Sequence, residues 1–278
     1  MFDRETVSYR VKQILTALGI RKSGFFTPFA YASSVSSEVP AYEAVEAFFE
    51  GSIADFKVFL ESIKTTLPDF RKAVEENAIP FEECGMFPKL DSIAAYHLVR
   101  ERKPTRVVEI GSGASTHVLA RALNDNQHGN LLCIDPKPRR SIESTGAEVH
   151  CRTLSTEDAK LVENFEPNDV LFIDSSHVML PGMDVDIQFN RMFPALPSGA
   201  LVHVHDIFLP DSYPVEWNQR MFSEQNALIG WILSGFFEVI FPSYYVATRL
   251  EPELKEVLQD ITPINPQQNA GSIWLKRI

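Results

Sequence analysis

The sequence predicts an α/β protein with a mostly parallel, seven-stranded sheet, preceded by a separate helical region. Three observations lead to this prediction. From residue 106 onward, short apolar runs alternate with helix-like segments, an order that places parallel strands between covering helices. The run RVVEI is followed by the turn GSG and a helix-like segment, and the next apolar run ends in Asp135. Residues 1–88 lack this alternation and instead show apolar residues at helical spacing.

The N-terminal region, 1–88, reads as a set of helices. Apolar residues recur at helical spacing over 7–18, and two further amphipathic helices are predicted over 42–50 and 53–66. We expect this region to act as a cap or as a dimerisation arm for a second region, 89–278.

The second region opens with a helix predicted over 91–102. Strands are predicted in regular alternation at 106–110, 130–134, 147–151, 169–174 and 199–205. Helices are predicted between and after them at 115–124, 138–145, 156–164, 183–192 and 215–232. Two last strands, 236–241 and 272–276, flank a short helix at 252–260. The alternation is typical of a Rossmann-like sheet with helices on both faces.

Composition narrows the class of protein. The chain has 278 residues, a hydrophobic content of 45% and a formal charge of −11, which argues against a nucleic-acid partner because phosphate contacts need clustered Lys and Arg. The basic run 137–140 reads as the start of a helix instead. Cys84, Cys133 and Cys151 are too scattered for a disulfide frame or a zinc site, and the last two read as buried. No apolar run reaches 18 residues and no leader pattern opens the sequence, so we expect a cytoplasmic protein without a membrane partner.

The glycine turn after the first strand indicates a nucleoside-binding unit. Gly111 and Gly113 let the backbone turn sharply and approach a ligand closely. Asp135, at the carboxyl end of the next strand, is placed to bind both hydroxyls of a ribose. Ser115 is expected to cap the following helix, to contact the cofactor, or both.

Two further positions bear on which cofactor binds. A dinucleotide fingerprint has a third glycine where this chain has Thr116. Glu109, two residues before the first glycine, would repel a pyrophosphate and suits a cationic ligand or one with an ammonium group. The pattern EIGSG resembles motif I of the class I S-adenosylmethionine-dependent methyltransferases. This resemblance implies S-adenosylmethionine as cofactor and an antiparallel edge hairpin formed by the last two strands. The predicted cofactor-binding residues are Glu109, Gly111, Ser112, Gly113, Ser115, Asp135 and Asp174.

Ionisable side chains follow the fourth and fifth strands. Asp174 ends one strand and is followed by His177, and the next strand ends in His205 and Asp206. Adjacent strands lie roughly 4.8 Å apart, so the two aspartates are expected side by side. Two such carboxylates repel each other, which predicts a divalent cation such as Mg or Mn, a shared proton or a histidinium between them. His177 or His205 could act as the base, whereas His203, deeper in the strand, reads as a hydrogen-bonded core residue.

A longer stretch carries a second resemblance. The segment FIDSSHxxxxGxDVxxxFNRMFPALPSGALVHVHDIFLPDSYPxxW resembles bacterial methyltransferases that act on hydroxyl groups of sugars or natural products. This likeness implies that Asp174, His177, His205 and Asp206 form the reaction site. Metal-dependent catechol-type enzymes have an aspartate–asparagine pair after the fifth strand, whereas here Ile207 follows the aspartate, which leaves the metal open.

The sequence as a whole predicts a methyltransferase that transfers a methyl group from S-adenosylmethionine to oxygen on a small hydroxylated molecule. The aromatic loop 208–217 is expected to close over this acceptor. One alternative is an NAD(P)-dependent oxidoreductase, because the glycine turn and Asp135 also suit a dinucleotide. Another is a catalytically silent scaffold that binds the cofactor and dimerises through its N-terminal region.

Overall fold

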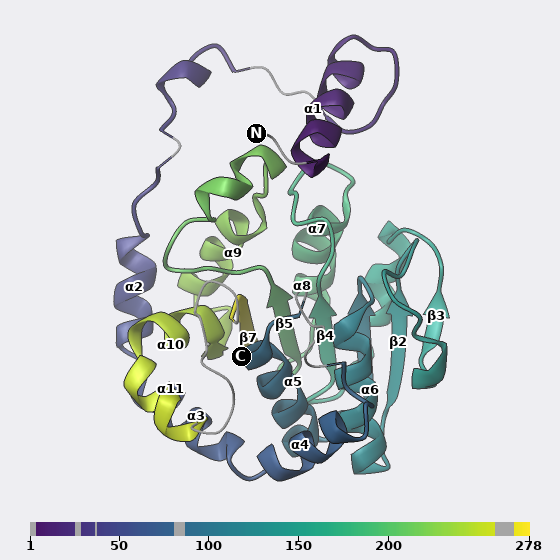
Figure 1. Cartoon of the computed structure of the whole chain (residues 1–278), viewed down its shortest axis with the longest axis vertical. Coiled ribbons are helices and arrows are strands. Elements are labelled where there is room, and N and C mark those ends of the chain that lie inside the picture. Colours follow the sequence, from purple (N-terminus) through teal and green to yellow (C-terminus); the bar gives the residue numbers. More distant parts are fainter. Residues whose placement is uncertain (1–3, 26–28, 37, 81–86, 259–269) are drawn as a thin grey trace.

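The computed structural model describes residues 4–25, 29–36, 38–80, 87–258 and 270–278. Within these ranges a seven-stranded sheet has the order β3-β2-β1-β4-β5-β7-β6, which lies at the centre of the body (Figure 1). The strands are β1 (Arg106–Ile110), β2 (Asn130–Ile134), β3 (Glu148–His150), β4 (Val170–Ile173), β5 (Leu201–His205), β6 (Phe237–Pro242) and β7 (Ser272–Arg277). The first five are parallel, β5 and β6 both pair with β7 in antiparallel fashion, and the register shifts between Val239 and Phe241. The predicted sheet and its antiparallel edge hairpin are therefore confirmed.

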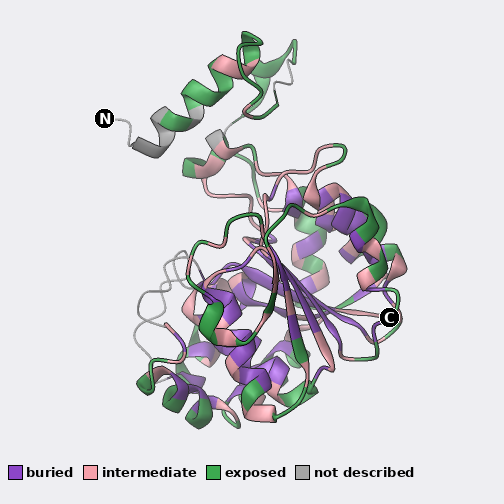
Figure 2. Ribbon diagram, turned by 90° about the vertical axis from the view of Figure 1, so that its right-hand side faces the viewer, coloured by how far each residue is buried: buried purple, intermediate pink, exposed green. Residues whose placement is uncertain are grey.

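Helices lie on both faces of the sheet (Figure 2). The α-helices are α1 (Arg4–Ala17), α2 (Glu43–Glu50), α3 (Ile53–Ile63), α4 (Leu67–Glu75), α5 (Lys89–Arg102), α6 (Ala114–Asn126), α7 (Asp184–Ile187), α8 (Phe193–Ala195), α9 (Glu224–Leu233), α10 (Ser243–Arg249) and α11 (Glu251–Val257). Shorter 3₁₀ turns are η1 (Ala32–Ser34), η2 (Glu143–Thr145), η3 (Thr156–Leu161) and η5 (Val215–Arg220), and η4 (Gln188–Met192) is a π-helical turn. No helix in the described ranges combines the length and apolarity needed to cross a membrane.

Several predicted helices differ from the observed ones. The helices expected at 138–145 and 156–164 are wrong, because the structure has only the 3₁₀ turns η2 and η3 there. The helix expected at 215–232 is interrupted at Met221, whose positive φ of 56° ends η5 before α9 begins. Residues 137–140, read as a helix start, instead contribute to the wall of a cavity. The structure adds α4, whose Pro68 occupies the first helical turn, where a missing N–H costs nothing.

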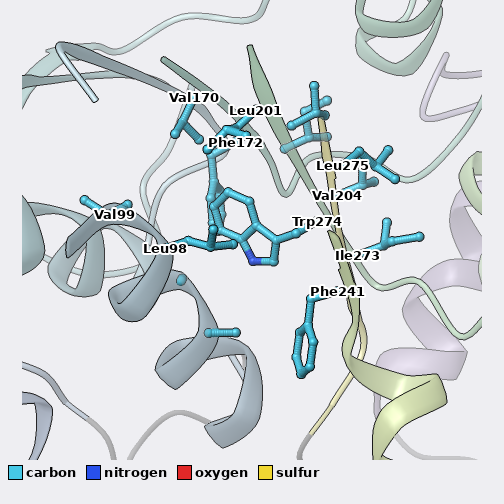
Figure 3. Packing of buried hydrophobic residues seen from close by; sticks show 14 of the residues in the cluster. Leu98, Val99, Val170, Phe172, Leu201, Val204, Phe241, Ile273, Trp274 and Leu275 are labelled. Atoms are coloured by element: carbon cyan, nitrogen blue, oxygen red, sulfur yellow. The ribbon is translucent and has the colours of Figure 1, made fainter. Parts of the chain in front are cut away.

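The core lies between the sheet and its covering helices. Trp274 and Phe172 are fully buried and project from the sheet toward Leu98 and Val99 of α5 (Figure 3). Helices α2, α3 and α4 contribute to the same cluster of buried apolar residues, for example through Phe56. The N-terminal helices from residue 43 onward therefore pack on the sheet region.

The two cysteines that the structure describes differ in their exposure to solvent. Cys133 is buried as expected, but Cys151 is exposed because β3 already ends at His150. Cys84 lies outside the described residues.

A salt bridge secures the turn η3. Asp158 accepts hydrogen bonds from Arg152 and from the backbone N–H and side chain of Ser155. Burial opposes ionisation of Asp158, but these donors outweigh it and lower the pKa of its carboxyl to about 2. The contribution to stability is thus present above the unfolded pKa near 4 and is lost as the pH falls toward 2.

We therefore expect Asp158→Asn to lower the free energy of unfolding by about 1 to 2 kcal/mol at pH 7. The difference from wild type should shrink between pH 4 and pH 2, as measured by urea unfolding at several pH values. A difference that stays constant down to pH 2 would contradict this assignment.

Candidate active site

A cavity of about 720 Å³ opens at the carboxyl ends of β1, β2 and β4. In an open parallel sheet this edge is where ligands bind. Most predicted cofactor residues line the cavity: Gly111, Ser112, Gly113, Ser115, Asp135 and Asp174. Side chains that the sequence did not point to also line it, among them Phe87, Met183 and Asp184.

The glycine turn after β1 is held tightly against β4. Gly111 has φ +87°, and a Cβ added there would stand 1.7 Å from the backbone oxygen of Asp174. A Cβ on Gly113 would meet nothing within 4 Å. Gly111 is therefore needed because another group comes too close for a side chain. That group is the backbone of Asp174, whereas the sequence predicts a bound ligand.

Glu109 lies beneath this turn. Its side chain is fully buried, and its oxygens accept hydrogen bonds from Ser115 Oγ at 2.6 Å and Thr116 Oγ1 at 2.7 Å. Burial raises the pKa of Glu109 to about 7. Thr116 Oγ1 also accepts the N–H of Gly113 at 3.0 Å, so the residue that replaces the third glycine braces the turn.

The role predicted for Glu109 in cofactor binding stays a prediction. The Glu109 carboxylate supports the first turn of α6, and it is not among the residues that line the cavity. Direct binding of a ligand ammonium group by Glu109 does not follow from this geometry.

Asp135 stands at the wall of the cavity, as predicted. Its Oδ2 accepts the N–H of Ser112 at 2.7 Å and its Oδ1 accepts the N–H of Lys137 at 2.6 Å. A carboxylate has about four acceptor sites, so both oxygens retain capacity for ligand hydroxyls. Its role with ribose stays a prediction.

Asp174, His177, His205 and Asp206 come together beside the cavity, and we call them the histidine–carboxylate cluster. His177 Nε2 lies 3.5 Å from Asp174 Oδ1 and 3.2 Å from Asp206 Oδ2. His205 Nδ1 lies 3.4 Å from Asp174 Oδ1 and 3.5 Å from Asp206 Oδ1. Of the three occupants predicted between the aspartates, the imidazole rings are the one that the structure places there.

The cluster strongly perturbs its own titration. Burial disfavours charge on His205, but Asp174 and Asp206 outweigh it and raise the pKa of the ring to about 9. The pKa of His177 is likewise raised well above its ordinary value, because its carboxylate neighbours outweigh burial. In return, the two imidazoles hold the pKa of Asp174 far below its usual range despite burial. At neutral pH both rings are therefore held protonated, and neither can accept a proton until it has lost one.

Each imidazole has a third carboxylate, fully buried, on the side away from Asp174 and Asp206. His177 Nδ1 lies 2.8 Å from Oε2 of Glu224, the first residue of α9. His205 Nε2 lies 3.8 Å from Oδ2 of Asp91, which also accepts hydrogen bonds from Gly271 N and Ser272 Oγ. Sequence reasoning missed both carboxylates, because each lies on a helix that is distant along the sequence from the strand end it meets.

Two residues of the histidine–carboxylate cluster have an unusual backbone conformation. His177 and Asp206 adopt positive φ angles of 59° and 55°, a conformation that costs energy for residues other than glycine. The carbonyl of His177 accepts the N–H groups of Ser223 and Glu224 at 2.9 and 3.2 Å. The start of α9 therefore fixes both the ring and the backbone of His177.

His203 differs from its predicted state in one respect. It is fully buried, as expected for a core residue, and it stacks on Phe172 at 3.8 Å between ring centroids. However, neither ring nitrogen has a hydrogen-bond partner among the described residues, and burial holds its pKa well below the ordinary value. It is a neutral, stacked core histidine.

The aromatic loop packs beside the cluster. Phe208 contacts Trp217 and Tyr244, with ring centroids at 5.2 and 5.3 Å, and Phe222 lies 4.8 Å from the ring of His177. None of these four aromatic residues is among those lining the cavity. Closure of this loop over an acceptor stays a prediction.

The predicted metal site finds no support. In the described ranges, no group of three or more His, Cys, Asp and Glu side chains is arranged to hold a metal ion. Mg²⁺ prefers an octahedral shell of oxygens, whereas two imidazole rings stand between Asp174 and Asp206. The donor set therefore does not fit this cation.

Comparison with known proteins gives one family match. Residues 108–207 match a family described as a methyltransferase domain, and no curated protein matches the chain. Similar solved structures include the O-methyltransferase TomG from Streptomyces achromogenes, involved in tomaymycin synthesis and solved with S-adenosylmethionine (19% identity, 66% of this chain and 77% of that one, TM-score 0.39). Another is an O-methyltransferase from Bacillus cereus in complex with S-adenosylhomocysteine (15% identity, 75% of this chain and 90% of that one, TM-score 0.44). A third is a putative caffeoyl-CoA O-methyltransferase from Staphylococcus aureus (14% identity, 84% of this chain and 100% of that one, TM-score 0.43).

The matched segment spans β1 to β5, and thus the glycine turn, Asp135 and the histidine–carboxylate cluster. The strand order and the cavity at the carboxyl edge agree with the fold that the sequence predicted. Residues 108–207 of this chain are similar to the methyltransferase domain family.

Proposed function

We propose that this chain is an S-adenosylmethionine-dependent O-methyltransferase acting on a small hydroxylated molecule of the sugar or natural-product type. The observation that carries the proposal is the position of Asp174. It lines the cavity of the methyltransferase domain and also contacts both imidazoles of the histidine–carboxylate cluster. Asp174 would therefore contact both a ligand in the cavity and the two imidazoles that can accept or donate a proton. The cytoplasmic location stays a prediction.

The cavity suits the proposed cofactor. Asp135 offers acceptors for ribose hydroxyls, and the Oγ of Ser112 is buried, borders the cavity and lacks a hydrogen-bond partner within the described ranges. Asp174, ionised at neutral pH, places a negative charge at the far wall. When bound, S-adenosylmethionine supplies an electrophilic methyl group on a positively charged sulfur.

The cluster would accept the proton of the acceptor hydroxyl. A positive charge beside Asp174 disfavours charge on the two imidazoles, so their pKa values fall toward the neutral range when a cationic ligand binds. His177 keeps its Nδ1–H bond to Glu224, which directs Nε2 toward Asp174 and Asp206. In this proposal Nε2 of His177 takes up the proton, while Asp206 and His205 hold the ring and balance its charge.

Calorimetric titration tests the cofactor assignment. We expect the chain to bind S-adenosylmethionine and S-adenosylhomocysteine, and Asp135→Ala to weaken binding about ten- to a hundredfold, because hydrogen bonds to a charged group are lost. Asp55→Ala, on an exposed part of α3, is the matched control and should bind as wild type does. Binding of NAD alone would favour the oxidoreductase, and cofactor binding without methyl transfer to any of a panel of hydroxylated acceptors would favour the silent scaffold.

A further inference from the structure

The N-terminal segment before Tyr42 stands apart from the body of the protein (Figure 2). Tyr42 is tied to the body, because its N–H donates to the carbonyl of Pro210 at 2.8 Å and its hydroxyl accepts from Asn226 at 2.5 Å. We call the described residues between 4 and 39 the arm. Its helix α1 lies against η5 above the carboxyl edge of the sheet (Figure 1).

The arm carries most of the apolar surface that the chain leaves exposed. Of fourteen large hydrophobic side chains that are exposed in the described ranges, nine lie between Val11 and Val39. Leu18, Ile20 and Tyr31 are 66%, 68% and 69% exposed. A soluble protein rarely leaves so much apolar surface uncovered in one segment unless another surface covers it.

The spacing of these residues fits a helix-packing seam. Val11, Ile14 and Leu18 follow one another at intervals of three and four residues, the pattern of positions that pack against another protein element. All three are exposed in α1 and the turn after it, at 48%, 57% and 66%. The contact with η5 therefore leaves this stripe uncovered.

Charge indicates which surface fits the arm. Residues 4–39 contain five Lys and Arg against two Asp and Glu, a net charge of +3. Since the chain totals −11, the remaining residues carry −14. A basic, apolar arm thus complements the acidic body of a second copy.

The irregular part of the arm argues against a lipid surface. Exposed apolar residues continue beyond α1 to Phe29, Val35 and Val39, where the residues that the structure describes form only the short turn η1. If this stretch is covered, its backbone N–H and C=O groups need hydrogen-bond partners, which a protein surface supplies and lipid chains do not.

We propose that the arm packs its apolar stripe on the body of a second copy of this chain, forming a two-fold dimer. Each copy then gives and receives one arm, so the contact is repeated and closed. This proposal does not depend on the proposed cofactor or reaction.

Sedimentation velocity of the full chain between 0.5 and 100 µM tests the proposal; these concentrations are about those at which protein dimers are commonly resolved. We expect a dimer that weakens as NaCl is raised, because the contact is partly electrostatic. The double variant Ile14→Asp, Leu18→Asp should raise the dissociation constant about a hundredfold or more. Val58→Asp replaces a side chain of α3 that is 69% exposed and should leave the dimer intact.

Two controls separate the outcomes. Thermal unfolding of the double variant should match wild type at a concentration where both are monomeric, because the stripe is exposed within its own chain and only association would add stability to wild type. Calorimetry with S-adenosylmethionine reports on the cofactor site independently. A wild-type monomer at 100 µM, or a double variant that remains dimeric, would overturn the proposal. So would a monomer that binds vesicles of phosphatidylserine and phosphatidylcholine through the same stripe.

Discussion

Replacing Gly111 with alanine is expected to destabilise the protein by about 3 kcal/mol or more. The new methyl group would stand 1.7 Å from the backbone oxygen of Asp174, and the backbone already has a positive φ that alanine adopts poorly. To avoid this clash, β1 and β4 would have to move apart at the edge of the sheet where the cavity lies. Urea unfolding should therefore show reduced stability, and any folded fraction should bind the cofactor weakly.

Gly113→Ala is the matched control, since a Cβ there meets nothing within 4 Å and its φ of 179° suits any residue. It should unfold close to wild type. If Gly111→Ala were as stable as Gly113→Ala, the tight contact between the glycine turn and Asp174 would not exist as described.

Glu224→Gln is expected to lower kcat about a hundred- to a thousandfold, while the affinity for S-adenosylmethionine stays within about twofold. Glu224 is not among the described residues that line the active-site cavity, so we regard it as a positioning residue that acts through Nδ1 of His177 at 2.8 Å. The amide keeps the size of the side chain but removes the charge that helps to fix and protonate the ring. Steady-state kinetics over a range of pH should show both the lower kcat and a displaced pH profile.

Glu251→Gln offers a comparison for this change, because Glu251 also begins a helix but is exposed and pairs with Lys255. It should retain full activity. An unchanged pH profile in Glu224→Gln, with reduced thermal stability alone, would mean that this carboxylate serves only the fold. His177→Ala, which removes the predicted proton acceptor, should lose at least as much kcat as Glu224→Gln.

The sequence was sufficient for the sheet because β1, β2 and β4 are mainly apolar runs that are followed directly by glycine or aspartate. It also brought Asp174 and Asp206 together correctly, since strand ends meet at one edge. It could not reveal Glu224 or Asp91, whose places depend on how α9 and α5 pack on the sheet. Nor could it show that the oxygens of Glu109 are taken by Ser115 and Thr116, because side-chain hydrogen bonding is decided by three-dimensional contacts.

The order of the strands in space has a consequence for biosynthesis. Strand β7 follows every other strand in the chain, yet it lies inside the sheet, between β5 and β6. While the chain leaves the ribosome, the edge of β5 therefore remains without its neighbour until residues 272–277 have emerged, and β6 has no strand to join. The nascent protein must keep this unpaired edge from associating with other chains, and the acidic character of the body favours such mutual repulsion.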